Sequence, residues 1–541
     1  MKRKALYLDL LLKEEVVEGR PEYSFFSHRA RTALQDVLEI LNRASQDRRV
    51  RALVLTVENL SAGWGRLSTL RRSIAEFRRS GKPALCFMQN GGNAEYYLAA
   101  ACDQIFMAPA GNLNLVGLTT EVFFFREVLE RLGVKPQLQS IGEYKSAGEM
   151  FTRTGLSEPA REQWNDLLDD LFEEFRQAIA DSRHLDLAEI GNLVDSGPYT
   201  ATEAVSKGLI DGTCYHDELE GRLHEKLGTR VYPVAAARYF SGEGLFKRLL
   251  TYRRPRIAVI DILGHINSGE SRRNNAGQRV TGSDTIGQFL DHARKSSRVR
   301  GVVLRIDSPG GTGTASDHIW RKIALLRQSK PVVVSFGDVA ASGGYYISAA
   351  ASRILSEPTS ITGSIGVLGG KFVAKELMSR LAVYRESIRR GAHAEYDSFF
   401  TPFTQAEMEK LEHQLTEFYQ EHFVKKVAKG REMSEETVDR VGRGRVWSGL
   451  RAKERGLVDM LGGIPEAIQE VRRLAKIPDD RKIRLLHYYR RRRLREMLIP
   501  EFKPHLHAEL LPQPALELLD VLELFATSKV LLLMPFRIRI R

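Results

Sequence analysis

The chain repeats itself, and this duplication limits its possible folds more than any other feature. When the sequence is aligned with itself, Arg49–Leu55 falls on Arg298–Leu304, and Tyr96 falls on Tyr345. The register holds without a gap from about 49 to 118 and then continues with small shifts. Self-similarity over such a length predicts two diverged copies of one folding unit.

The repeat sets the expected domain organisation. The chain has 541 residues, too many for one ordinary hydrophobic core. We expect an N-terminal repeat at 1–225 and a C-terminal repeat at 255–475, joined by a linker at 226–254. The duplication then stops, and residues 476–541 form a basic C-terminal extension.

Strand and helix patterns alternate within each copy. Apolar runs separated by amphipathic segments predict parallel strands joined by helices, which is an α/β arrangement. In the second copy the expected strands are Ile257–Leu263, Val299–Ile306 and Pro331–Val334, and the expected helices are Ser283–Ser296 and Ala315–Gln328. A long amphipathic helix follows in each copy. The second of these begins with a capping box, Thr404 with Glu407.

Composition excludes several classes of function. The net charge is +13, but basic and acidic residues are intermixed and no nucleic-acid motif is present. Three scattered cysteines, Cys86, Cys102 and Cys214, form no metal-binding pattern and suit a reducing compartment. We therefore expect no metal, no cofactor and no nucleic-acid partner.

No membrane-crossing or secretory segment is expected. The apolar run Ala5–Glu14 is short, is interrupted by Asp9, and alternates like a first strand. Toward the other end, Arg490–Arg493 and Phe536–Arg541 are basic, and Val530–Met534 is strand-like. A packed extension is the preferred interpretation, and contact with an anionic membrane surface is the alternative. The expected location is cytoplasmic, or peripheral on the cytoplasmic membrane.

The two copies differ where chemistry is expected. Ser342 lies between an apolar strand and a helix, on a turn that presents a hydroxyl beside outward-pointing N–H groups. The first copy has Asn93 at this place. Conversely, Lys145 of the first copy falls on Ala392 of the second. Such complementary loss is typical of a site shared between the copies, although a structural protein drifting by chance would also produce it.

Specific motifs connect the chain to a known family. They are Asp307–Gly311, Gly337–Tyr346, Thr362–Gly366 and Gly142–Ala147. Over roughly 1–475 the chain resembles the long, tandem-domain form of signal peptide peptidase A, also called protease IV. The resemblance implies tandem Clp-protease/crotonase-like α/β spiral domains with long amphipathic helices. It also implies membrane-associated Ser–Lys endopeptidases that degrade cleaved signal peptides and assemble into homo-oligomeric, bowl-shaped rings, here expected to be tetrameric.

The same resemblance assigns roles to individual residues. Ser342 corresponds to the nucleophile, Lys145 to the general base, and Ser364 to the serine that hydrogen-bonds the lysine. A lysine serves as a base only when burial lowers its pKa of about 10.4 by several units. Lys145 Nζ should then lie about 2.6–3.2 Å from Ser342 Oγ. His318, next to Asp317, is the weaker candidate for the base.

Backbone N–H groups complete the expected site. The oxyanion would be held by the N–H of Gly343 together with that of Gly310 or Gly311. Two other functions stay open at this stage. One is a crotonase-type enzyme acting on acyl-CoA, and the other is a non-catalytic ring scaffold.

Overall fold

The computed structural model describes residues 5–19, 31–240, 254–274, 278–489, 524–525 and 530–534. They fall into two compact units that do not follow the order of the chain. The first contains Met1–Thr120 and Leu168–Arg253, and the second contains Glu121–Leu167 and Arg254–Ile538. Lys145 therefore belongs to the same compact unit as Ser342, although it lies in the sequence of the first copy.

A parallel sheet forms the centre of the first unit. Its strands follow the order β10-β6-β4-β3-β1-β11, and β2 pairs with β1. They are β1 (Leu6–Val17), β2 (Arg31–Ala33), β3 (Val50–Ser61), β4 (Ala84–Met88), β6 (Gln104–Met107), β10 (Gly212–Thr213) and β11 (Tyr232–Ala235). The run at Ala5–Glu14 is thus a first strand, as predicted. The expected linker 226–254 contains β11, which pairs in parallel with β1.

The sheet is accompanied by short connecting elements. Helices α1 (Leu34–Gln46), α2 (Trp64–Arg79), α3 (Asn93–Ala99), α7 (Leu187–Asp195), α8 (Ala201–Ser206), α9 (Leu219–Leu227) and α10 (Ala236–Phe240) follow its strands. A small sheet is built from β5 (Gly91–Gly92), β7 (Asn112–Asn114) and β9 (Tyr199–Thr200). The long helix α6 (Glu158–Arg183) corresponds to the amphipathic helix predicted in the first copy.

The second unit is built on a similar sheet. Its strand order is β22-β20-β18-β16-β12-β24. In addition, β19 pairs with β18, and β23 pairs with β19. Its strands are β12 (Arg256–Leu263), β16 (Val299–Ser308), β18 (Val332–Ala341), β19 (Arg353–Ser356), β20 (Ile361–Gly363), β22 (Val446–Ser448), β23 (Met460–Leu461) and β24 (Arg484–Tyr488). Strands β12, β16, β18 and β20 run parallel, as predicted for a chain of alternating strands and helices.

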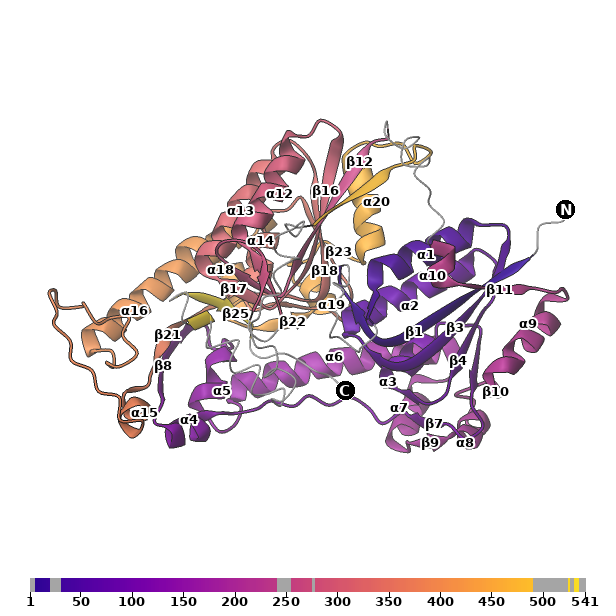
Figure 1. Ribbon diagram of the computed structural model, residues 1–541, viewed down its shortest axis with the longest axis horizontal. Coiled ribbons are helices and arrows are strands. Elements are labelled where there is room, and N and C mark those ends of the chain that lie inside the picture. The colour runs from indigo at the N-terminus through magenta and orange to yellow at the C-terminus, as the bar shows by residue number, and fades with distance from the viewer. Residues whose placement is uncertain are drawn as a thin grey trace. The chain divides into compact units, whose positions relative to one another are not determined.

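Helices cover both faces of this sheet. Figure 1 shows α12 (Ser283–Lys295) and α13 (Gly313–Arg327) on one face and α20 (Ile464–Leu474) on the other. The apolar stripes of α12 and α13 pack with the buried residues of the strands in one continuous core. Helices α12 and α13 match their predicted ranges to within two residues. The strand β24 lies within the segment 476–541 and extends the sheet at β12.

A second sheet in the same unit contains Gly310 and Gly311 and the strand that precedes Lys145. Its order is β14-β15-β13-β17-β25-β21-β8. The strands are β8 (Lys135–Ile141), β13 (His265–Asn267), β14 (Arg272–Arg273), β15 (Arg279–Gly282), β17 (Gly310–Thr312), β21 (Val367–Val373) and β25 (Leu531–Leu533). Strand β8 precedes Lys145 and pairs antiparallel with β21 along its full length. This pairing holds the lysine segment in the second unit (Figure 1).

The remaining helices of the second unit lie around these sheets. They are α4 (Arg126–Leu132), η1 (Ser146–Gly148), α5 (Glu149–Thr152), α14 (Gly343–Ser348), α15 (Lys375–Arg380), α16 (Gln405–Glu417), α17 (Lys425–Arg431), α18 (Glu435–Val441) and α19 (Gly449–Glu454). Thr404 and Glu407 form the predicted capping box of α16. A π-helical segment, Phe418–Val424, joins α16 to α17. The basic runs Arg490–Arg493 and Phe536–Arg541 lie outside the described residues.

Candidate active site

Ser342 occupies a strained turn between β18 and α14. Its φ angle is 52°, in the left-handed region that non-glycine residues rarely adopt. The turn is held because the Ser342 N–H donates to the Gly363 carbonyl at 2.8 Å, and the Tyr346 N–H donates to the Ser342 carbonyl at 2.8 Å. The expected helix after the serine starts at Gly343, immediately behind the hydroxyl.

Lys145 meets this serine within the second unit. Its Nζ donates to Ser342 Oγ at 2.8 Å, inside the range expected from the sequence. The same Nζ donates to Ser364 Oγ at 3.0 Å and to the Ser364 carbonyl at 3.1 Å. The lysine side chain is only 3% exposed, and both serines are completely buried. The three residues therefore form one enclosed cluster.

Burial determines the protonation state of the lysine. It lowers the pKa of Lys145 well below the ordinary value, because the charged ammonium loses its hydration. Desolvation is the cause of the shift, and no carboxylate contributes to it. A neutral amine beside a hydroxyl can accept the proton that the hydroxyl loses on attack.

Ser364 lies in a second strained turn, directly after β20. Its φ angle is 51°, and its N–H donates to the Arg445 carbonyl at 2.7 Å. Since its hydroxyl and carbonyl oxygens both contact Lys145 Nζ, the side chain and backbone of this turn orient the amine together.

The predicted oxyanion glycines lie close to one another. A Cβ built on Gly310, whose φ angle is +111°, would lie 3.0 Å from the Gly343 nitrogen. A Cβ built on Gly343 would lie 3.1 Å from the Gly311 nitrogen. The N–H of Gly310 already donates to Ser308 Oγ at 3.2 Å. Of the two alternatives left open by the sequence, this engagement favours Gly311 as the partner of Gly343.

Gln163 of α6 braces the lysine segment, and sequence reasoning missed it. Its completely buried amide donates to the Tyr144 carbonyl and to Ser146 Oγ, both at 3.1 Å, and accepts from the Val446 N–H at 3.1 Å. The residues on both sides of Lys145 are thereby tied to the first residue of β22. The sequence offered one signal for this role, because Gln163 is a polar residue beside Trp164 on the apolar stripe of the helix.

Arg445 adds a second brace to the same segment. Its guanidinium lies 4.6 Å from the centre of the Tyr144 ring and donates to the Tyr144 hydroxyl at 3.1 Å. It also forms ion pairs with Asp166 and with Glu162, the latter at 2.9 Å. Because the Arg445 carbonyl also accepts from the Ser364 N–H, this residue contacts both Tyr144, the neighbour of Lys145, and Ser364, which contacts the Lys145 amine.

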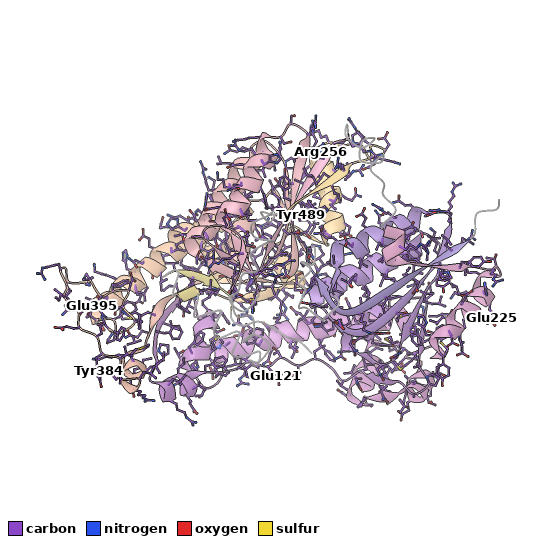
Figure 2. The ribbon with its side chains drawn as sticks, in the orientation of Figure 1. Glu121, Glu225, Arg256, Tyr384, Glu395 and Tyr489 are labelled. Carbon is purple, nitrogen blue, oxygen red and sulfur yellow. The ribbon has the colours of Figure 1, made fainter. Side chains whose placement is uncertain are left out.

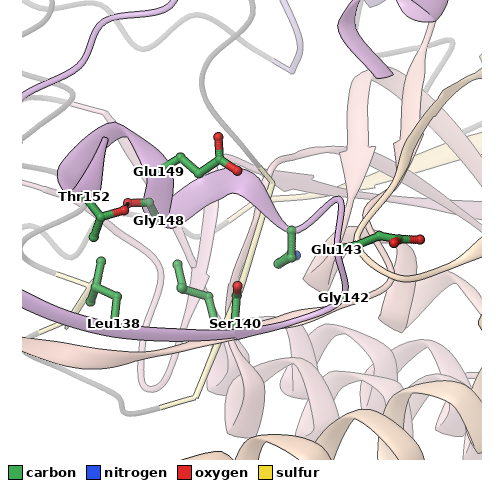
Figure 3. A pocket seen from close by; sticks show the side chains of 9 residues that line it. Leu138, Ser140, Gly142, Glu143, Gly148, Glu149 and Thr152 are labelled. Atoms are coloured by element: carbon green, nitrogen blue, oxygen red, sulfur yellow. Dashed lines mark hydrogen bonds between the residues drawn. The ribbon is translucent and has the colours of Figure 1, made fainter. Parts of the chain in front are cut away.

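A cleft of about 380 Å³ opens beside Lys145 (Figure 3). Its lining combines an apolar floor, Leu138 and Leu368, with the carboxylates of Glu143 and Glu149. Figure 3 shows Leu138 and Ser140 on β8 and Glu149 and Thr152 on the helical segment opposite. A peptide therefore has room next to the amine.

The other candidates lie apart from this cluster. His318 is half exposed, and its Nδ1 is 4.0 Å from Asp284.

In the part of the chain that the structure describes, no group of three or more His, Cys, Asp or Glu side chains is arranged to hold a metal ion. None of the helices in that part is both long enough and apolar enough to cross a membrane.

The first copy has no counterpart of the cluster. Asn93, aligned with Ser342, begins α3, and its amide is engaged by the backbone. Its Nδ2 donates to the Gly117 carbonyl at 2.8 Å, and its Oδ1 accepts from the Val116 N–H at 3.3 Å. The corresponding turn in the first unit is therefore structural.

Comparison with known proteins identifies the class. The sequence profile described as "Peptidase family S49" matches residues 76–230 and 324–478. The chain is 34% identical over 462 residues to "Serine protease SPPA, chloroplastic" of Arabidopsis thaliana, covering 85% of this chain and 68% of that protein. It is 30% identical over 479 residues to "Protease 4" of Salmonella typhi, covering 85% of this chain and 75% of that protein. Among solved structures, a ClpP1 mutant from Listeria monocytogenes shares 16% identity with a TM-score of 0.26, covering 41% of this chain and 99% of that one.

These matches define a serine-type endopeptidase. The chain belongs to peptidase family S49, whose profile it matches twice. The predicted α/β fold with two repeats of one family and the predicted resemblance are confirmed. Lys145 lies in the first matched segment, and Ser342 and Ser364 lie in the second.

Proposed function

We propose that the chain hydrolyses apolar peptides, such as cleaved signal peptides, with a Ser342–Lys145 dyad. The observation that carries this proposal is the 2.8 Å hydrogen bond between two buried groups, an amine with a lowered pKa and a hydroxyl on a strained turn. The wider assignment, a serine peptidase of family S49, rests on the family match.

Each step of the reaction has a residue to perform it. Neutral Lys145 accepts the Ser342 proton as Oγ attacks the scissile carbonyl, and the N–H groups of Gly343 and of Gly310 or Gly311 stabilise the oxyanion. The lysine then gives its proton to the leaving amine. Water, deprotonated by the same amine, hydrolyses the acyl-enzyme. Ser364, whose hydroxyl and carbonyl oxygens accept from Lys145 Nζ, holds the amine next to Ser342 Oγ.

An apolar cluster supports the choice of substrate. Buried side chains from α4, η1, α5 and β21 gather beside the lysine segment. They are Leu129, Ala147, Met150, Phe151 and Leu368. Leu368 of this cluster also lines the cleft together with Leu138, and this apolar part of the lining suits the side chains of a hydrophobic peptide.

A fluorogenic apolar peptide tests the proposal. We expect hydrolysis by the wild type, and loss of it by about 10⁴-fold or more in Ser342→Ala and in Lys145→Ala. A fluorophosphonate should label Ser342. Full hydrolysis by Lys145→Ala would remove the lysine from the mechanism, and absence of labelling would favour a scaffold. Turnover of an acyl-CoA would favour the crotonase-type alternative.

We also propose a homo-oligomer, in which an exposed segment between α15 and α16 contacts a neighbouring copy. Tyr384 is 83% exposed and Ile388 is 90% exposed, and Leu381, Val383 and Phe399 are also exposed. Figure 2 shows Tyr384 and Glu395 in this segment. A tetrameric ring would cover these side chains. Sedimentation of Ile388→Asp at a smaller mass than the wild type would support the contact, and an unchanged mass would contradict it.

We propose further that the protein is located in the cytoplasm or on the cytoplasmic membrane. The basic runs near the C-terminal end would make the peripheral contact with that membrane. The support is compositional, because each basic residue near an anionic surface adds about 1 kcal/mol of attraction. Co-sedimentation with phosphatidylserine vesicles tests it. Binding that is absent at low salt would overturn it.

A further inference from the structure

Strand β25 lies in the slot that flanks the nucleophile. It pairs antiparallel with β17, placing Leu532 opposite Gly311, and with β21, placing Leu531 opposite Leu368. Two further main-chain bonds extend the pairing. The Gly313 N–H donates to the Val530 carbonyl at 3.0 Å, and the Met534 N–H donates to the Pro309 carbonyl at 2.8 Å. We refer to Val530–Met534 as the plug segment.

The backbone of the plug segment reaches the oxyanion glycines. A Cβ built on Gly310 would lie 1.9 Å from the Leu532 carbonyl oxygen and 3.0 Å from the Gly343 nitrogen. A carbonyl of the chain itself thus lies next to the N–H that is proposed to hold a substrate carbonyl. Strand addition beside a binding loop is a general way to recognise an extended peptide, because main-chain bonds supply affinity for any sequence.

The side chains of the plug segment also match the proposed substrate. Leu531 and Leu533 point to one side, into the apolar cluster that contains Met150, Phe151 and Leu368. Leu532 points to the opposite side, into the main core of the unit. All three leucines are buried, so the segment fills alternate subsites as an extended apolar peptide would.

The contacts of the plug segment bear on how access to the active site is regulated. We propose that the plug segment occupies the place of the substrate strand, so that the chain holds its own active site filled and a substrate must displace it. The inference rests on the proposed function, because it concerns access to the same site. If the slot is filled in about nine molecules of ten, the apparent KM is about tenfold higher than that of the open site.

The test compares full-length variants. Leu531→Asp combined with Leu533→Asp places two charges in the apolar cluster and should release the plug segment. Leu450→Asp combined with Met460→Asp adds the same charges at partly exposed positions of the same unit and serves as the control. We expect the first variant to lower KM for a fluorogenic apolar peptide about tenfold, with kcat unchanged, and to speed fluorophosphonate labelling of Ser342 by a similar factor. The control should leave all three quantities unchanged.

A milder variant keeps the test decisive if the charged one fails to fold. Leu531→Ala combined with Leu533→Ala weakens the same contacts without adding charge, and KM should again fall. If KM is unchanged or rises in the folded variants while Ser342 is still labelled, β25 is a wall of the site and the inference is overturned. If no variant is labelled and none hydrolyses peptide, the proposed function fails instead.

Discussion

Ser342 holds a backbone conformation that its own side chain disfavours. With φ at 52° and ψ at −110°, the residue occupies a region that glycine enters at no steric cost. This conformation places Oγ at 2.8 Å from Lys145 Nζ. The strained backbone at Ser342 therefore lowers the stability of the fold while it positions the hydroxyl.

Ser342→Gly should separate the stability cost of the strained backbone from the catalytic effect of losing the hydroxyl. We expect the glycine variant to be more stable than Ser342→Ala by about 1 kcal/mol, because only glycine relieves the positive φ. Both variants should be inactive. Denaturant unfolding provides the measurement. Equal stabilities of the two variants would show that the turn carries no strain.

Lys145 should make activity depend on pH. Because the pKa of its ammonium is lowered by burial, kcat/KM should rise with pH and level off well below the ordinary lysine value of about 10.4. Ser364→Ala removes one of the two Ser364 oxygens that contact Nζ, and we expect kcat to fall. A profile that keeps rising up to about pH 10 would show that the amine is not neutral at physiological pH.

The same burial predicts a stability effect. Below pH 10.4 the unfolded chain binds a proton at Lys145 more readily than the folded chain, so unfolding becomes harder as pH rises toward that value. Lys145→Met removes this linkage. The stability of the variant relative to wild type should therefore be most favourable at low pH and decline toward about pH 10, as followed by urea unfolding. A constant difference would contradict the lowered pKa.

At the scale of elements, Gln163 joins α6 to the lysine segment and to β22. Gln163→Leu removes three hydrogen bonds at a buried position and should cost about 1–3 kcal/mol of stability. We expect kcat to fall and the acidic limb of the pH profile to move upward, because a loosened Lys145 becomes hydrated. Gln177→Leu on the exposed face of the same helix is the control. A fall in kcat without movement of the limb would indicate a purely structural role.

The sequence predicted elements where the local pattern was strong. Strands β12 and β16 are apolar runs, and α16 begins at the expected capping box, so local chemistry alone was sufficient. After Ser342 the pattern predicts helix only over Ile347–Ala351, whereas α14 begins at Gly343, because its first residues are glycines, which carry no helical pattern. The pairing of β8 with β21 depends on contacts between distant residues and has no local signature.

The candidate site was predictable only where the two repeats differ in residues that carry chemistry. Ser342 and Lys145 stood out because each is missing from the other repeat, so the comparison between copies pointed to both. Gln163 and Arg445 belong to no motif that carries chemistry, and their roles arise only from folded contacts. That β25 lies beside Gly311 was likewise not predictable, although the strand itself was expected.

At the scale of the whole molecule, the compact units cross the boundary between repeats. Residues 121–167 belong with the second unit, since β8 completes its functional sheet. A chain of residues 254–541 therefore lacks both Lys145 and β8, one of the two strands that pair with β21. The domain boundaries expected from the repeat, 1–225, 226–254, 255–475 and 476–541, stay predictions about the duplicated sequence.

This shortened chain should fail in two ways. We expect it to hydrolyse no peptide, because the base is missing, and to aggregate, because the edge of β21 is left open. Full-length Lys145→Ala is the control, since it lacks the amine but keeps β8, and it should stay monodisperse in light scattering. A soluble, active 254–541 chain would show that the first repeat contributes nothing to the site.

The separation of Lys145 and Ser342 along the chain has a consequence for biosynthesis. A ribosome that has released only the first repeat has made an amine with no alcohol to activate. The turn that carries the alcohol, and the Ser364 oxygens that steady the amine, emerge 197 and 219 residues later than the lysine. With the proposed dyad, we therefore expect proteolytic activity to begin only when synthesis is well advanced, so that half-made chains should not cleave the proteins around them.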